Sequence, residues 1–134
     1  MLKADHVKQS DDGATYAGDH LLLDFSGAQN LTDIDVIRDA LESSAAAAGA
    51  TIVHSHCHRF GDSGGITGVT VLAESHITIH TWPEHNYAAI DIFMCGKCDP
   101  NDCIETLESA FKPQRITERL VQRGQDIGDV RAVA

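Results

Sequence analysis

The segment ITGVTVLAESHITIHTWPEHNYAAIDIFMC, residues 66–95, contains three strand-like stretches in a row. Residues 66–74, 75–82 and 87–95 are rich in Val, Ile and Thr, the residue types that favour strands. Pro83 separates the last two stretches, because proline has no N–H group to donate within a sheet. Consecutive strands with short connections indicate an antiparallel sheet.

Further strands are predicted on both sides of this segment. A continuous apolar run predicts a buried strand at 20–28, and strand-like composition predicts two more at 51–60 and 114–122. Residues 1–17 are polar, and we expect this segment to be loose at its end.

Two helices are predicted between these strands. The first is capped by Thr32 or Asp33 and ends at Gly49, with apolar residues at helical spacing in between. The second opens at Pro100 and carries its apolar residues on one face.

The order β-α-β-β-β-α-β, over a single domain of 134 residues, predicts an α+β fold. In this fold an antiparallel sheet carries both helices on one face, and its other face stays bare. A half-covered sheet usually finds a partner, so we expect a homodimer in which two sheets meet, an α/β/β/α sandwich.

The composition narrows the possible partners and compartment. A net charge of −10 argues against a nucleic-acid partner, because phosphate binding needs a basic face. No apolar run approaches the roughly 18 residues of a membrane span, and the N-terminus lacks the apolar core of a signal peptide. We therefore expect a cytoplasmic protein without a membrane partner, whose four cysteines are reduced.

Two short motifs suggest metal or redox chemistry. His54, His56 and His58 alternate along one strand and so share a face, where imidazoles can bind zinc, although a polar strand face can also simply use histidine. The spacing of Cys95 and Cys98 suits zinc or a redox pair. A zinc site would need a second pair of cysteines at this spacing. Apart from Cys103, five residues after Cys98, only Cys57 remains.

The third motif, AESHITIHTWPE at 73–84, crowds proton-handling groups into one strand. The hydroxyl of Ser75 can attack the preceding peptide bond if the backbone there is strained, and His80 is a natural proton carrier. The resulting ester would break by β-elimination and leave a pyruvoyl group. A Ser and a His in a plain structural strand would look the same on spacing alone. Simple alternation also places these two side chains on opposite faces, unless a bulge or the cleavage itself brings them together.

The sequence also resembles a known family. GVTVLAESHITIHTWPEHNYAAIDIFMCG is similar to the processing and catalytic segment of the short prokaryotic S-adenosylmethionine decarboxylases, which are pyruvoyl enzymes. GDHLLLDFSGA resembles the first strand of that family, and IRDALESSAAAAGAT and CDPNDCIETLESAF resemble its two helices. The resemblance extends over about residues 18–124.

The resemblance implies a proenzyme that cleaves itself between Glu74 and Ser75, into residues 1–74 and 75–134. Ser75 would become the pyruvoyl cofactor and form a Schiff base with S-adenosylmethionine, which loses carbon dioxide on the way to spermidine. His80 corresponds to the proton carrier of processing and Cys95 to the acid that protonates the substrate carbon. Thr67 falls where many members have Ser and would support processing.

The resemblance further implies that Phe60 and Glu84 contact the substrate, that no metal takes part, and that active sites lie near a dimer interface. Two alternatives stay open. The same fold family includes pyruvoyl-dependent arginine decarboxylases, which share these motifs, and a non-catalytic zinc-binding protein would use the His and Cys motifs instead.

Overall fold

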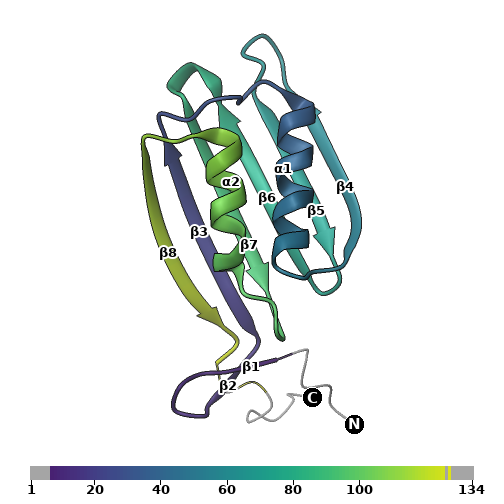
Figure 1. Cartoon of the computed structure of the whole chain (residues 1–134), viewed down its shortest axis with the longest axis vertical. Coiled ribbons are helices and arrows are strands. Elements are labelled where there is room, and N and C mark those ends of the chain that lie inside the picture. The colour runs from purple at the N-terminus through teal and green to yellow at the C-terminus, as the bar shows by residue number, and fades with distance from the viewer. Residues whose placement is uncertain (1–6, 126, 128–134) are drawn as a thin grey trace, which may run out of the picture.

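The computed structural model describes residues 7–125 and 127, and it confirms the predicted α+β fold. Two helices cover one face of a six-stranded sheet (Figure 1). The strand order is β4-β5-β6-β7-β3-β8, and all neighbours are antiparallel. The strands are β3 (Gly18–Ser26), β4 (Ile52–Arg59), β5 (Ile66–Leu72), β6 (Ser75–Trp82), β7 (Tyr87–Met94) and β8 (Arg115–Arg123).

The first helix begins at a side-chain cap that the sequence suggests. For α1 (Ile34–Ala47) the cap is Asp33, whose carboxylate accepts a hydrogen bond from the backbone N–H of Val36. A short 3-10 turn, η3 (Pro100–Cys103), leads directly into α2 (Ile104–Phe111). No helix in the described part of the chain is long and apolar enough to cross a membrane.

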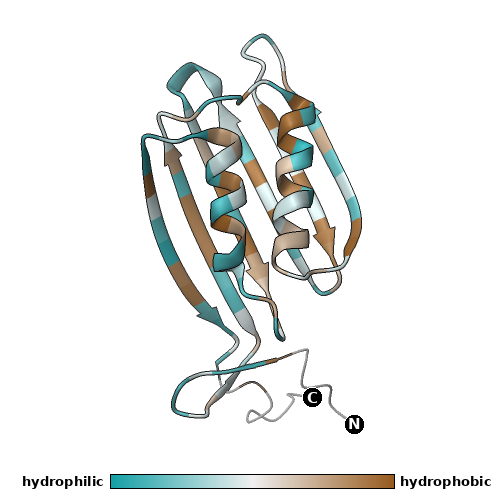
Figure 2. Cartoon of the chain, viewed as in Figure 1, coloured by the Kyte–Doolittle hydropathy of each residue, from teal (hydrophilic) through white to brown (hydrophobic). Residues whose placement is uncertain are grey.

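The core lies between the helices and the covered face of the sheet. Along β6 and β7, every second side chain is buried beneath the helices, and brown apolar bands mark these positions in Figure 2. Phe25, Leu41, Ile77 and Phe111 are fully buried there. Burial of each such side chain contributes about 1.5–3 kcal/mol, so this one interface holds the domain together.

The opposite face of the sheet is not covered by any described part of the chain. It presents large apolar side chains that are 37–42% exposed, namely Leu22, Val71, Trp82 and Val121. It also presents six of the eight histidines, namely His20, His54, His56, His58, His76 and His80. We call this surface the bare face.

The polar N-terminal segment contains a hairpin that the sequence did not predict. A small hairpin of β1 (Lys8–Gln9) and β2 (Thr15–Tyr16) precedes the main sheet, while residues 1–6 lie outside the described part of the chain. A second short element, the 3-10 turn η2 (Pro83–His85), connects β6 to β7.

Replacing Phe111 by Ala is expected to lower the free energy of unfolding by about 3–5 kcal/mol, because the ring is fully buried against Phe25 and leaves a cavity. The measurement is urea unfolding in a Ser75→Ala background, which keeps the chain in one piece. Leu120→Ala, at a half-exposed position on β8, is the control and should change stability by less than about 1 kcal/mol. Equal losses in both variants would contradict this location of the core.

Candidate active site

A strained turn lies at the predicted cleavage bond. Leu72 of β5 pairs with Ser75 of β6, so only Ala73 and Glu74 connect the two strands. Glu74 has a φ of 63°, in the left-handed region that favours glycine. For a residue with a side chain this conformation costs about 1–2 kcal/mol. The backbone is therefore strained directly before the peptide bond between Glu74 and Ser75, and such strain is common at functional sites.

The thiol of Cys95 contacts both sides of this bond. Cys95 directly follows β7, which lies beside β6 in the sheet. Its Sγ donates to the carbonyl oxygen of Glu74 over 3.5 Å and lies 3.8 Å from the Oγ of Ser75. The nucleophile, the carbonyl and the acid suggested by the sequence thus form one group.

The other predicted residues form a second group on the bare face. Thr67 and His80 are cross-strand partners, with 3.1 Å between the threonine Oγ1 and the histidine Nδ1. They line a hollow of about 200 Å³ together with Phe60, Trp82 and Glu84. The predicted proton carrier His80, the hydroxyl beside it and both predicted substrate contacts are therefore neighbours.

The two groups are far apart within one chain. Ser75 and His80 are five residues apart on β6, which corresponds to about 16 Å along a strand. The alternation of β6 also directs their side chains to opposite faces, and no bulge interrupts its pairing with β5. One chain therefore does not bring Ser75 and His80 into contact.

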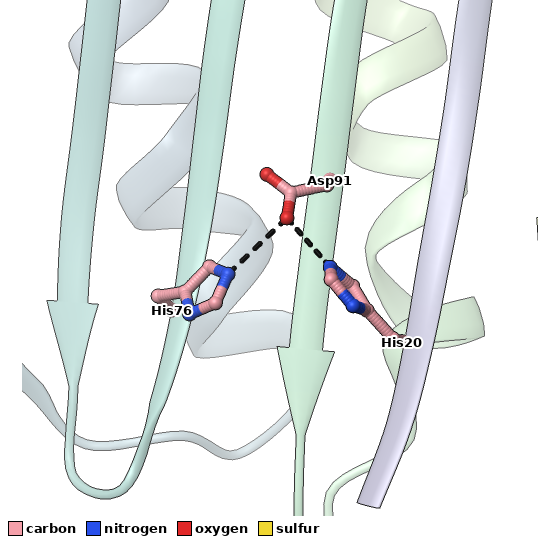
Figure 3. A group of neighbouring side chains, drawn as sticks. All are labelled: His20, His76 and Asp91. Atoms are coloured by element: carbon pink, nitrogen blue, oxygen red, sulfur yellow. Dashed lines mark hydrogen bonds and ion pairs between the residues drawn. The ribbon is translucent and has the colours of Figure 1, made fainter. Parts of the chain in front are cut away.

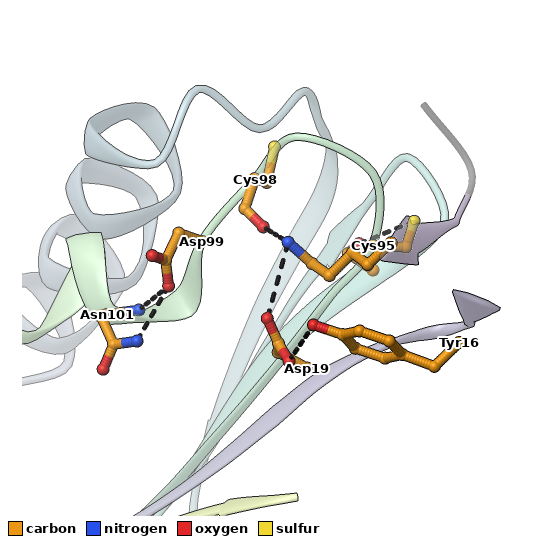
Figure 4. Close-up of polar contacts among 8 residues, drawn as sticks. Tyr16, Asp19, Cys95, Cys98, Asp99 and Asn101 are labelled. Carbon is orange, nitrogen blue, oxygen red and sulfur yellow. Dashed lines mark hydrogen bonds and ion pairs between the residues drawn. The ribbon is translucent and has the colours of Figure 1, made fainter. Parts of the chain in front are cut away.

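The loop that begins at Cys95 is tied to the N-terminal hairpin (Figure 4). Lys8 donates to the carbonyl oxygen of Cys98 over 2.5 Å and forms an ion pair with Asp19 at 3.6 Å. The hydroxyl of Tyr16 donates to Asp19, and burial together with this hydrogen bond raises the pKa of Tyr16 to about 12. The hairpin thus supports the loop that carries the thiol.

Cys57 and Cys103 are placed as structural residues. All four thiols are free, and Cys103 is fully buried. Burial raises the pKa of Cys57 and raises that of Cys103 to about 12, so both are protonated at neutral pH. This environment suits packing rather than metal or redox chemistry.

The histidine row of β4 lies on the bare face, as its alternation predicts. His54, His56 and His58 are all exposed. Alternate residues of a strand lie about 7 Å apart, and the ring centroids of His56 and His58 are 6.5 Å apart. Among the described residues, the potential ligand atoms of these three histidines do not come together as a group that could hold one metal ion.

A cluster that the sequence did not reveal lies near the start of β6. Asp91 of β7 accepts hydrogen bonds at one carboxylate oxygen from the Nε2 of His20, at 2.6 Å, and from the Nε2 of His76, at 3.2 Å (Figure 3). Thr78 donates to its other oxygen. The three residues come from neighbouring strands whose pairing cannot be read from spacing along the chain.

The potential ligand atoms of His20, His76 and Asp91 lie within 4.8 Å of one another, close enough to consider a metal ion. The position of Arg123 favours hydrogen bonding over metal binding in this cluster. Its guanidinium lies 3.2 Å from the Nδ1 of His20 and can only donate, so Nδ1 accepts and Nε2 carries the proton that points to Asp91. A metal ion would have to displace that proton beside a permanent positive charge.

The surroundings of Asp91 favour its charged form. Burial raises its pKa, but hydrogen bonds from Thr78, His20 and His76 lower it more, and the net shift is downward. Asp91 is therefore an ionised acceptor at neutral pH.

Comparison with known proteins bears on this arrangement. The family model described as S-adenosylmethionine decarboxylase matches residues 19–124. The S-adenosylmethionine decarboxylase proenzyme of Thermomicrobium roseum is 36% identical over 108 residues, which cover 80% of this chain and 93% of that protein. The proenzyme of Methanococcus maripaludis strain C5 is 42% identical over 110 residues, 80% of this chain and 89% of that protein. The crystal structure of adenosylmethionine decarboxylase from Aquifex aeolicus is similar with a TM-score of 0.70 and 35% identity, covering 80% of this chain and 90% of that one.

Asp91→Asn is expected to remove a pH-dependent part of the stability. A carboxyl group whose folded pKa lies below the ordinary value of 3.8 stabilises the fold above that pH, and the contribution disappears as the pH falls through the folded pKa. At pH 7 the variant should be less stable by about 1–2 kcal/mol, and the difference should shrink below about pH 4. Urea unfolding across pH, with both proteins carrying Ser75→Ala, measures this. A difference that stays constant down to pH 2 would contradict it.

Proposed function

We propose that the chain, which belongs to the S-adenosylmethionine decarboxylase family, is a proenzyme that cuts itself between Glu74 and Ser75 and then decarboxylates S-adenosylmethionine. Residues 1–74 and 75–134 then become two chains of one domain. The main support is the contact of the Cys95 thiol with the Glu74 carbonyl at the strained turn. The names of the relatives favour the sulfonium substrate over arginine, the alternative that the motifs left open.

Self-cleavage follows from the groups around the turn. The Oγ of Ser75 adds to the carbonyl carbon of Glu74, the C–N bond breaks, and the freed amine takes up a proton, which leaves an ester. Negative charge develops on the Glu74 oxygen, and the Cys95 thiol is the donor placed beside it. Loss of the Ser75 α-proton then expels the Glu74 carboxylate, and hydrolysis of the remaining dehydroalanine releases ammonia and leaves a ketone.

The residues present fit a pyruvoyl group at position 75. A new N-terminus there would begin β6 next to the thiol of Cys95, which lies 3.8 Å from Ser75. The ketone supplies a carbonyl that binds the substrate amine and accepts the electrons released with carbon dioxide. Cys95 can then deliver a proton to the substrate carbon.

A homodimer accounts for the distance between the two groups of residues. Exposed apolar side chains on the bare face favour a second copy as its cover. If two bare faces meet about a two-fold axis near Thr78 with the β6 strands antiparallel, the strand end that carries the Glu74–Ser75 bond of one chain lies opposite the partner subunit's His80. Thr78 is suited to the axis because it lies about midway between these two positions in the sequence.

The substrate fits the hollow beside His80. Phe60 and Trp82 offer aromatic faces there, which can hold a sulfonium or stack on adenine, and the Glu84 carboxylate can accept hydrogen bonds from ribose hydroxyls. Net charge also favours a cationic sulfonium ligand over an anionic one.

Intact-mass measurement tests the cleavage directly. Purified protein should contain two chains, 1–74 and 75–134, the second with a blocked N-terminus whose ketone borohydride reduces. Ser75→Ala should remain a single chain, because it lacks the nucleophile, and should have no decarboxylase activity. Wild-type protein that stays whole after long incubation would refute the proposed function.

Mixed dimers test whether His80 acts on the partner chain. Alone, Ser75→Ala should not cleave, and His80→Ala should cleave at least about 100-fold more slowly than wild type. When both are co-expressed, the His80→Ala chain should be cut, because its Glu74–Ser75 bond then lies opposite an intact His80 of the partner subunit. Failure of co-expression to restore any cleavage, although mixed dimers form, would show that the proton carrier acts within one chain.

A further inference from the structure

The side chains of the Asp91 cluster form a continuous chain across four neighbouring strands. In the order of the sheet, Arg123 of β8 binds His20 of β3, His20 binds Asp91 of β7, and Asp91 binds His76 of β6. We call these four residues the Arg123–His76 network. The proposed cleavage and decarboxylation use none of these four residues.

The network ends one residue from the proposed cleavage bond. His76 directly follows Ser75 and is the first residue of β6 that pairs with β7. Its ring stacks on Phe93 at 6.0 Å with an interplanar angle of 26°, and its Nε2 donates to Asp91. Ser75 itself has a partner on β5 but none on β7, so it lies just outside the firmly paired part of the sheet.

The same network reaches towards the thiol. Asp91, Phe93 and Cys95 alternate along β7 and its extension. The tie between Asp91 and His76 therefore joins β6 and β7 shortly before the point where Ser75 and Cys95 meet. Neither strand end can shift along the other without breaking this hydrogen bond.

We propose that His20, Asp91 and Arg123 are positioning residues that hold His76, and through it Ser75, in register with Cys95. This role rests on the proposed self-cleavage. Before cleavage the network keeps the Ser75 hydroxyl and the Glu74 carbonyl beside the thiol. After cleavage the turn between β5 and β6 no longer restrains residue 75, and a free strand end tends to fray. The hydrogen bond of His76 to Asp91 is then the side-chain anchor nearest to the new terminus.

The polarity of the network makes the role testable with matched substitutions. His20 must accept from Arg123 and donate to Asp91, which is only possible with the proton on Nε2. His20→Gln keeps an N–H donor near that position, whereas His20→Leu fills similar space without a donor. A space-filling role would make Leu at least as good as Gln, and a positioning role would make Gln better.

The experiment measures the rate of self-cleavage of freshly made full-length proenzyme. His20→Leu and Asp91→Asn should slow cleavage about 10- to 100-fold, the effect of a misplacement of about 1 Å, while His20→Gln should stay within about threefold of wild type. Once cut, His20→Leu should show a reduced kcat with KM changed less than about twofold. Asp24→Asn is the control, because Asp24 lies on the same face of β3 but binds only Tyr87. It should cleave at the wild-type rate.

The outcomes separate this inference from the proposed function. No cleavage of wild type would refute the proposed function itself. Normal cleavage of wild type with equal rates for His20→Leu and His20→Gln would overturn the positioning role alone.

Arg123 is exposed on the edge strand β8, so Arg123→Leu and Arg123→Gln provide the same comparison without a risk to the core. Equal cleavage rates for Arg123→Leu, Arg123→Gln and wild type would overturn the proposed role of Arg123.

Discussion

The two-residue period of β6 is the constraint on which the proposed chemistry depends. Because side chains alternate, the strand buries Ile77 and Ile79 beneath the helices and presents His76 and His80 on the bare face. The same alternation separates Ser75 from His80 by a face, and the strand rise separates them by about 16 Å. A strand that is straight enough to pack a core cannot also fold its own histidine back onto its own serine. In the proposed dimer, a second chain would supply the missing histidine without bending the strand.

One-sided coverage of the sheet gives its two faces different tasks. The covered face holds the side chains that stabilise the domain, including Phe25 and Phe111. The bare face carries the polar groups that do not suit a core, and its hydrogen bonds run across the strands rather than into the helices. The network is therefore separate from the core, because no side chain of the Arg123–His76 network packs against a helix in the described structure.

Local features of the fold were predictable and nonlocal ones were not. The strand at 75–82 was predicted with its observed bounds, because alternation and Pro83 mark it, and Asp33 was one of two predicted caps. The hairpin of β1 and β2 was missed, because its two-residue strands are too short to show a pattern. The tie between His20 and Asp91 joins residues 71 apart and depends on β3 lying between β7 and β8. The family resemblance, which the comparisons confirm, identified candidate residues but not the two groups into which the structure divides them.

The proposed self-cleavage would also change what holds the site together, and this would make an anchor beside Ser75 useful. The turn holds Glu74 in a left-handed conformation that costs about 1–2 kcal/mol, and breaking the bond would release that strain. The release would favour the proposed forward reaction, but it would also free the strand end that carries the proposed pyruvoyl group. Main-chain pairing with β5 alone resists fraying weakly at a terminus. A charged hydrogen bond from the adjacent residue contributes about 1.5–3 kcal/mol, which is enough to offset the loss of the turn. The carboxylate of Asp91 suits this role, because hydrogen bonds from Thr78, His20 and His76 favour its ionised form, and none of these three donors belongs to the turn that the proposed cleavage would break.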